Sequence, residues 1–248
     1  MDKKAAADTL EIRNLVLAAL KPDDRRALEP HFQFLTLVPG DILYEPGYTV
    51  DWVYFPNTAV LSVVTVMADG RAVESDTIGY ESVVGILNAL GATPAISRTF
   101  VQIPGAAVRL AAIQVRRRAE ESPQLRQLLI RHAQANLAQA HQSVACNALH
   151  GLDERLCRWL LMSHDRIARD EVHLTQQYLA TMLGVQRTTV TEALGQLAEA
   201  GLVHQGRGFI RILDRGRMQT VVCECYDAVR DNLQQLIGEE PANGPAEH

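Results

Sequence analysis

The 248-residue sequence lacks several features that would place it in particular classes of protein. No cysteine occurs before residue 146, so the first half of the chain has no thiolate to hold an iron–sulfur cluster, and none is expected. No run approaches the ~18 consecutive apolar residues of a membrane span. The opening segment, MDKKAAADTLEIRN, has no apolar core typical of a signal peptide. We therefore expect a cytoplasmic protein that makes no membrane contact.

Histidine is absent between Phe32 and Leu110, the segment that is richest in strand-like runs. A barrel enzyme of the cupin type needs several histidines and a carboxylate that converge inside the barrel. This absence argues against the cupin-like alternative, and we expect no enzymatic activity, no catalytic residue and no metal site. An isolated histidine such as His31 or His132 is more often a surface or core residue than a haem ligand.

The four cysteines all lie in segments with a helical pattern: Cys146, Cys157, Cys223 and Cys225. Two residues separated by two positions on a helix point roughly 200° apart. Cys223 and Cys225 are therefore expected to chelate one metal ion poorly. The sequence favours buried or incidental thiols over a redox site.

Net charge gives no support to nucleic-acid binding, because the formal value is −5. Such a function must rest on local charge. The length allows two modest domains with real cores, and the 47% hydrophobic content is typical of a soluble globular protein.

Short β-rich runs separated by turn signals fill the N-terminal half of the chain. They predict strands at 34–38, 42–44, 52–55, 59–67, 72–78, 99–103 and 107–110. The pattern predicts an antiparallel jelly-roll β-barrel over 32–111, preceded by an N-terminal helical segment over 1–31.

Helical patterns follow over 112–150. A short charged helix is expected at 113–121, a break at Ser122-Pro123, and one long helix from Gln124 to about Leu149. That helix carries a heptad seam, which predicts packing against a twin in a homodimer, although the same face also suits packing on the chain's own barrel. The seam comprises Ile130, Ala133, Leu137, Ala140, Val144 and Asn147.

Gly151 breaks the long helix and is a candidate hinge, with Asp153 expected to cap the next helix. Residues 151–220 are predicted to form a winged helix-turn-helix, carried by the stretch Leu174–Asp214. Residues 221–248 are predicted as a C-terminal helix to about Ile237, followed by a disordered tail, GEEPANGPAEH. The fold class is therefore α+β.

The helix-turn-helix prediction rests on caps and periodicity. Thr175 suits an N-cap and Gly184 a helix end with positive φ. Beyond Gln186, apolar residues recur at 190, 194 and 197, leaving a polar, short-chained face at the helix start, where recognition helices contact bases. The candidate DNA-contacting residues are Thr175, Gln176, Gln186, Arg187, Thr188, Thr189, Thr191, Glu192, Arg207 and Arg211.

The predicted wing joins the runs 202–204 and 209–212 through Gln205-Gly206-Arg207-Gly208. Between Gly201 and Arg217 there are four arginines against one aspartate, 4 − 1 = 3 net positive charges, which suits phosphate contact. A winged helix used only for protein contacts, as in an interaction adaptor, is the alternative.

The order of barrel, long helix, hinge and winged helix resembles the Crp/Fnr superfamily of bacterial transcription regulators. The segment LTQQYLATMLGVQRTTVTEALGQLAEAGLV is similar to the family's DNA-binding signature. The resemblance implies a homodimer on a palindromic double-stranded DNA operator, RNA polymerase as a partner, and base contacts by Gln186, Arg187, Thr188 and Glu192. Well-known members have a glutamate after the matching arginine and another arginine four residues later, where this chain has Thr188 and Glu192, so a different operator is expected.

The resemblance also implies a cyclic-nucleotide-binding-like domain whose signal reorients the recognition helices through Gly151. The matching effector residues are Gly79, Glu81, Ser82, Arg98 and Thr99. However, Tyr80 interrupts the family's Gly-Glu pair, and Glu81 and Arg98 are 98 − 81 = 17 residues apart where about ten is usual. The altered spacing, caused by the apolar insert 83–95, disfavours a cyclic nucleotide and leaves another small ligand or no ligand open.

Overall fold

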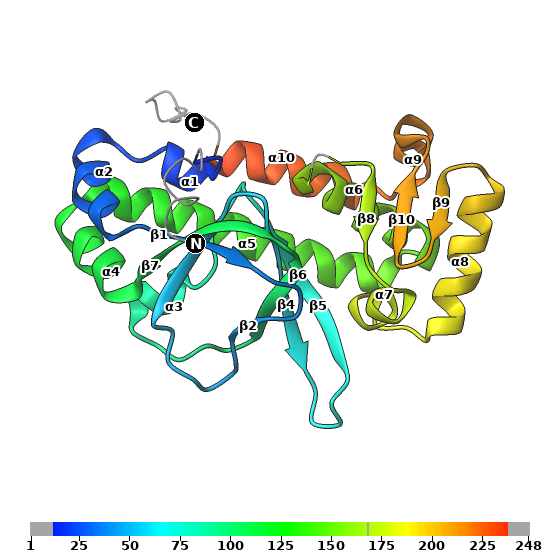
Figure 1. Ribbon diagram of the computed structural model, residues 1–248, viewed down its shortest axis with the longest axis horizontal. Helices are drawn as coiled ribbons and strands as arrows, with labels where there is room; N and C mark the ends of the chain where they lie inside the picture. The colour runs from blue at the N-terminus through cyan, green and yellow to red at the C-terminus, as the bar shows by residue number, and fades with distance from the viewer. Residues whose placement is uncertain (1–11, 168, 238–248) are drawn as a thin grey trace, which may run out of the picture.

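The structure is a computed structural model, and it describes residues 12–167 and 169–237 of the chain. It has a β-rich N-terminal domain, a smaller C-terminal domain, and one long helix that runs from the first to the second (Figure 1). The predicted disordered tail, 238–248, lies outside the described residues, as does the first part of the N-terminal segment, 1–11.

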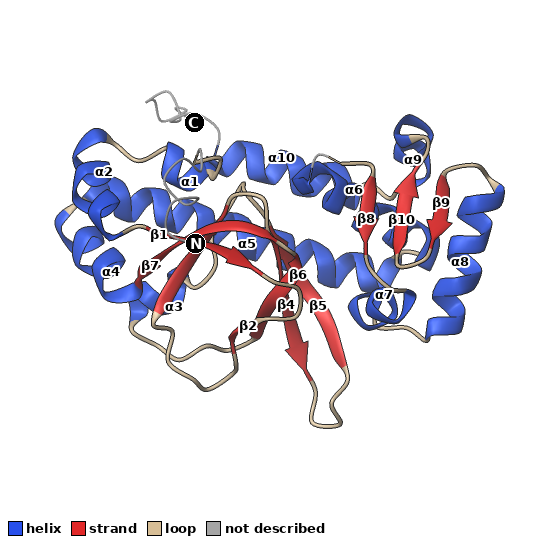
Figure 2. Cartoon of the chain, in the orientation of Figure 1, coloured by secondary structure: helices blue, strands red, loops and turns tan. Residues whose placement is uncertain are grey.

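The strands of the N-terminal domain form two antiparallel sheets, with the strand orders β1-β7-β3 and β2-β6-β4-β5 (Figure 2). Their bounds are β1 Gln33–Leu37, β2 Ile42–Tyr44, β3 Trp52–Pro56, β4 Val60–Val66, β5 Ala72–Ile78, β6 Arg98–Ile103 and β7 Gly105–Ala111. Each predicted strand is confirmed, with its ends displaced by two residues at most.

The α+β class is confirmed, and the described strands form the two antiparallel sheets of a jelly roll without closing into one barrel. The outer edge of β3 makes an isolated bridge between Tyr54 and Val84. Beyond β5 the chain turns at Gly85 into helix α3 (Ile86–Gly91), which the sequence did not predict. Gly85 has φ +84°, and a Cβ there would lie 2.2 Å from the Tyr44 hydroxyl, so this turn requires glycine.

Short helices cover one end of the sheets: α1 Leu15–Ala18, α2 Pro22–Leu28, η1 Glu29–His31 and α4 Ala112–Glu121. The buried Asp24 joins α2 to α4, because its carboxylate accepts hydrogen bonds from Arg118 Nε (2.7 Å) and Ser122 Oγ (3.0 Å). Ser122 also accepts from the Leu125 N–H at 3.1 Å and so caps the next helix. The predicted break at Ser122-Pro123 is confirmed.

The long helix α5 spans Pro123–Leu149, with the proline at its first position, where no N–H is needed. It ends at His150, and α6 (Leu152–Ile167) begins after Gly151. The prediction that Asp153 caps α6 is wrong, since Asp153 lies within the first turn. The Gly151 N–H instead donates to the Glu154 carboxylate at 2.9 Å.

The C-terminal domain is a helical unit around a three-stranded sheet of order β8-β10-β9. Its elements after α6 are β8 Glu171–His173, α7 Gln176–Leu183, α8 Arg187–Glu199, β9 Val203–Gly206, β10 Phe209–Ile212, α9 Arg215–Val221 and α10 Cys225–Ile237. Strand β8 was not predicted. Helix α10 packs along α5, so the chain returns toward the N-terminal domain (Figure 1).

The two domains share a hydrophobic core. Val60 of β4 and Ile103 of β6 belong to the same buried cluster as Leu156 and Leu160 of α6 and the apolar face of α8. The C-terminal domain is therefore packed directly on a sheet of the N-terminal domain as well as joined to it through α5.

Candidate nucleic-acid interface

The helix-turn-helix is built by the predicted caps. The Thr175 hydroxyl accepts a hydrogen bond from the Tyr178 N–H at 3.1 Å and caps α7. Gly184 ends α7 with φ +66°. A Cβ at Gly184 would lie 2.8 Å from Val73 of β5, so glycine also allows this turn to approach the N-terminal sheet. Gln186 precedes α8 as its N-cap residue.

Helix α8 has one buried face and one exposed tip. Val190 and Leu194 are fully buried and Leu197 nearly so, which fixes the rotation of the helix in the core. The predicted DNA-contacting side chains at its start all face solvent: Gln186, Arg187, Thr188, Thr189, Thr191 and Glu192. We refer to these six residues as the α8 tip.

A polar network fixes the tip relative to α7 and the wing. The Thr191 hydroxyl donates to Gln176 Oε1 at 2.8 Å, and Gln176 Nε2 donates to Gln205 Oε1 at 2.9 Å. Gln205 was assigned only to a hairpin loop, whereas it lies in β9 and connects the wing to both helices. No pattern in the sequence pairs position 205 with position 176.

A groove of about 460 Å³ lies between α7 and the wing, and Thr175, Gln176, Arg187 and Gln205 are among its lining residues. The wing turn depends on its glycines. A Cβ at Gly206 would lie 2.1 Å from the Phe209 ring, and Gly208 has φ +83°.

The predicted net charge of +3 overstates the positive field of the wing. Arg211 pairs with Glu171 of β8, where its Nε lies 3.0 Å from Oε1 and its hydrogen bonds lower the pKa of Glu171. Arg215 pairs with Asp165 at 2.7 Å. Within the described ranges, Arg207 and Arg217 are the two wing arginines that make no ion pair.

The surface can therefore contact an anion and hydrogen-bond to base edges. The N-terminal end of α8 carries the positive end of the helix dipole, and its first N–H groups have no partners within the helix. Arg187 places a guanidinium in that first turn, and Arg207 adds a second cation on the exposed wing. A narrow helix end flanked by cations suits the major groove and its phosphates.

Half of the predicted dimer seam faces solvent. Ile130, Leu137 and Val144 of α5 are 42%, 53% and 67% exposed. The other three are buried or half-buried against the chain itself: Ala133, Ala140 and Asn147. The exposed residues of α5 also recur with heptad spacing. They coincide with the predicted seam at every other position and lie one residue after it at the positions between. This α5 stripe consists of Gln127, Ile130, Gln134, Leu137, His141, Val144 and Ala148.

A cavity of about 430 Å³ lies between the β2-β6-β4-β5 sheet, α3 and α5. Its polar lining includes Ser75, Asp76, Ser97, Thr99 and Asn136. No lysine or arginine is among the described residues that line it. A ligand there would find hydrogen-bonding groups but no cation for a phosphate.

Thr99 is the one predicted effector residue that lines this cavity. The other four make contacts elsewhere: Gly79 N–H donates to Glu81 (3.0 Å), Glu81 pairs with Arg166 (2.8 Å), Ser82 donates to Asn136 (2.7 Å) and Arg98 pairs with Glu45 (2.9 Å). The structure therefore does not bring the five residues together around one space.

Glu81 instead belongs to a buried polar seam between the domains. Arg166 of α6 pairs with Glu81, and its Nη2 donates to the Thr77 carbonyl at 2.8 Å. Trp159 Nε1, also on α6, donates to Glu74 of β5 at 2.8 Å. Burial raises the pKa of Glu74, and it raises that of Asp76 well above its usual range. We call these six residues the interdomain seam.

The premise that the cysteines all lie on helices is wrong. Cys223 lies in the short link between α9 and α10, so the angle expected between Cys223 and Cys225 does not apply. Cys146 of α5, Cys223 and Cys225 form one buried group. Cys157 is buried separately in the C-terminal core, where desolvation raises its pKa to about 12.

No helix in 12–167 or 169–237 combines the length and apolar composition needed to cross a lipid bilayer.

Residues 154–221 match the family model of the Crp-like helix-turn-helix domain. The chain is 31% identical over 98 residues to the transcriptional regulator SdrP of Thermus thermophilus, a match that covers 37% of this chain and 48% of SdrP. The chain thus spans about half the length of that relative. It is 24% identical over 178 residues to the global nitrogen regulator of a Nostoc species, covering 65% of this chain and 76% of that protein.

The whole fold is also similar to solved structures. A transcriptional regulator of the crp/fnr family from Eubacterium rectale superposes with a TM-score of 0.68 at 15% identity, covering 85% of this chain and 99% of that one. FixK2 from Bradyrhizobium japonicum gives a TM-score of 0.67 at 18% identity, covering 77% and 98%. At these identities the similarity establishes the fold.

Proposed function

We propose that this chain is a transcription regulator of the Crp/Fnr superfamily and that it acts as a homodimer that binds a palindromic DNA operator through the α8 tip. A signal received by its N-terminal domain controls that binding. We place it in the cytoplasm with the DNA, with RNA polymerase as a further partner.

The observation that carries the proposal is the exposure of the α8 tip beside the groove and the wing. Arg187 can make a bidentate contact with guanine, and Glu192 can accept from a cytosine amino group. The Gln176–Thr191 and Gln176–Gln205 hydrogen bonds hold the tip and the wing in one geometry, as sequence-specific contact requires.

The α5 stripe supports a homodimer. Its exposed leucine, isoleucine and valine recur every seven residues, which is the spacing that packs against an identical helix. A two-fold dimer would place two α8 tips on half-sites roughly 34 Å apart.

The contact between the domains supports control by a signal. The α7–α8 turn packs on β5 at Val73, and β5 also lines the 430 Å³ cavity through Ser75 and Asp76. A ligand that binds more tightly to one arrangement of β5 would shift the α8 tip. Among the described residues no lysine or arginine lines this cavity, so the cavity favours a small uncharged ligand over a cyclic nucleotide.

Selection of binding sites from random double-stranded DNA, followed by anisotropy titration, tests DNA recognition. We expect Arg187→Ala to weaken binding to the selected site by about 1–3 kcal/mol, roughly 5- to 150-fold, with little change on random DNA. The control is Arg25→Ala, an arginine on α2 whose side chain is 40% exposed, at the far end of the molecule from α8 (Figure 1). Equal affinity of Arg187→Ala and the unmodified protein would contradict the proposal and favour an interaction adaptor.

Light scattering tests the dimer. Leu137→Asp should yield a monomer, because it places a charge at the centre of the α5 stripe. Leu87→Asp, an equally exposed leucine on α3, should leave the mass unchanged. A dimer that survives Leu137→Asp would exclude α5 as the interface.

A further inference from the structure

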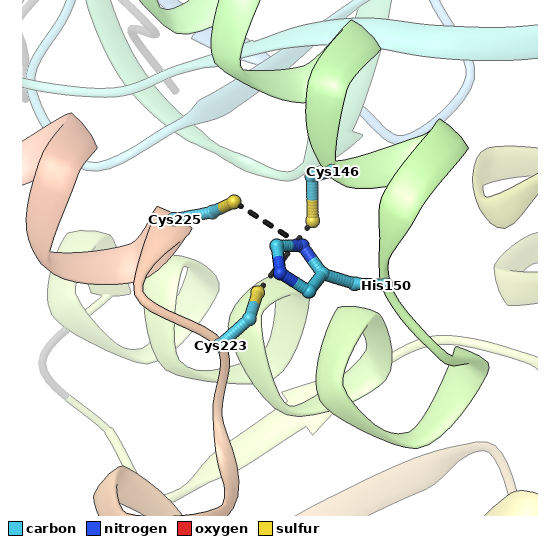
Figure 3. Close-up of side chains that lie close together, drawn as sticks. All are labelled: Cys146, His150, Cys223 and Cys225. Carbon is cyan, nitrogen blue, oxygen red and sulfur yellow. Dashed lines mark hydrogen bonds between the residues drawn. The ribbon is translucent and has the colours of Figure 1, made fainter.

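Four side chains that lie far apart in the sequence meet where α5 ends and α10 begins. Cys146 and His150 come from the end of α5, and Cys223 and Cys225 come from the α9–α10 link and the first residue of α10 (Figure 3). One ligand atom from each lies within 4.8 Å of all the others. The three thiols are buried, and the His150 side chain is 17% exposed.

The distances fit a single tetrahedral ion. With Zn–S near 2.3 Å and Zn–N near 2.05 Å, tetrahedral geometry puts two sulfurs about 3.8 Å apart and a sulfur and a nitrogen about 3.6 Å apart. The Cys146 and Cys223 sulfurs are 3.6 Å apart, and Cys225 Sγ lies 3.4 Å from His150 Nδ1. Small side-chain adjustments bring the remaining, longer pairs into the same shell.

The imidazole is already oriented as metal ligands are. His150 Nδ1 faces Cys225, and Nε2 lies 3.2 Å from the Glu224 carboxylate. A carboxylate that accepts from the outer N–H fixes the tautomer and leaves the inner nitrogen free to coordinate. Gln142 Nε2 lies 3.0 Å from Cys225 Sγ and supplies a hydrogen bond to that sulfur.

One arginine of α6 lies beside the cluster. Zinc with three thiolates and a neutral imidazole carries one net negative charge. Arg155 of α6 donates from Nε to Asn147, the neighbour of Cys146 on α5, at 3.1 Å, and so places a cation beside the cluster.

We propose that Cys146, His150, Cys223 and Cys225 bind one Zn²⁺ ion in a closed, structural site. Soft thiolates with imidazole select zinc over the oxygen-preferring cations, and four protein ligands leave no open position for chemistry. An iron–sulfur cluster distributes its cysteines over separate irons, farther apart than the ligands of one ion. The four ligand atoms here are gathered too closely for that.

The ion would fasten α10 to the end of α5, next to Gly151, where the chain passes into the C-terminal domain. Cys146 and Cys223 are 77 residues apart, so the ion closes a long loop. It would also fix the segment around Gly151, the candidate hinge predicted from the sequence, although the site itself stands without that role.

Metal analysis of the full-length, untagged protein tests the proposal. We expect about one zinc per chain by inductively coupled plasma mass spectrometry, and a thermal midpoint several degrees lower after chelation. Replacement of zinc by Co²⁺ should give thiolate-to-cobalt charge-transfer bands and the intense visible bands of a tetrahedral site.

Variants separate this site from other thiols. Cys223→Ser and His150→Ala should each lower zinc retention at least tenfold after dialysis against a weak chelator, whereas Cys157→Ser, a buried cysteine outside the cluster, should retain zinc fully. The zinc content of the unmodified protein tests the proposal even where a variant fails to fold. Iron with acid-labile sulfide, a Cys146–Cys223 disulfide seen by mass, or metal-free protein after zinc-replete expression would each overturn the proposal.

Discussion

Two polar regions of this molecule have opposite relations to solvent. The α8 tip leaves its arginine, threonines and glutamate in water, with Thr191 the member tied to a neighbouring element. The interdomain seam buries Glu74, Glu81 and Arg166, and Trp159 and Arg166 of α6 donate hydrogen bonds to the carboxylates of Glu74 and Glu81 across the domain boundary. Polar groups left exposed at a rigid helix end are available to another molecule, whereas buried paired ones fix the arrangement of the chain itself.

The largest effect is expected in the interdomain seam. Arg166→Met keeps most of the side-chain volume but leaves Glu81 buried without its cation, which should lower the free energy of unfolding by about 3–5 kcal/mol. Urea denaturation measures this. Arg25→Ala removes an exposed pair with Glu29 and should cost less than about 1 kcal/mol. Equal losses in the two variants would remove the distinction between buried and exposed polar groups.

The next effect concerns His132, which is fully buried in α5 with both ring nitrogens unpartnered among the described residues. Burial and the neighbouring Arg131 lower its pKa from 6.5 to about 4. Between these values the unfolded chain binds a proton that the folded chain does not. Stability is therefore retained above pH 6.5 and lost as the pH falls toward 4, by about 3 kcal/mol in total.

The difference in unfolding free energy between the unmodified protein and His132→Leu isolates this contribution, since the carboxylates titrate in both. That difference should be flat above pH 6.5 and should change steadily below it. A difference that stays constant from pH 8 to pH 4 would show that the imidazole takes up a proton in the folded state as readily as in the unfolded state, and would contradict the prediction.

The smallest effect separates two wing arginines. Arg207→Ala should weaken DNA binding and reduce the slope of log affinity against log salt by about 1, because Arg207 is free to meet a phosphate. Arg211→Ala should change both quantities less, because Arg211 is held by Glu171. Anisotropy titrations at several salt concentrations compare them. A larger loss for Arg211→Ala would show that DNA displaces Glu171.

Local signals predicted much of the fold and the site. Caps and periodicity located α7 and α8, because Thr175, Gly184 and Val190 act within a few residues of their own positions. Strand β8 has three residues, and its pairing with β10 defines it, so nothing local identified it. Helix α3 lies in an apolar insert where a helix and a buried strand have the same composition.

Partners distant in sequence account for the remainder. The wing charge was overstated because Arg211 and Arg215 meet Glu171 and Asp165 from earlier elements. The α5 stripe differs from the predicted dimer seam because a heptad pattern alone does not reveal which residues of the helix the N-terminal domain covers. The cysteine group was missed because a two-residue spacing was interpreted as helical, whereas Cys223 precedes the helix.

The burial of Val60 and Ile103 in the C-terminal core has a consequence for cooperativity. The N-terminal sheet and the C-terminal domain contribute side chains to one hydrophobic core, so neither domain can unfold while the other keeps its packing intact. Calorimetry of the intact chain should show one unfolding transition, whereas two domains that unfold independently would give two. Whatever makes the sheet more rigid would therefore also make the proposed DNA-binding surface more rigid.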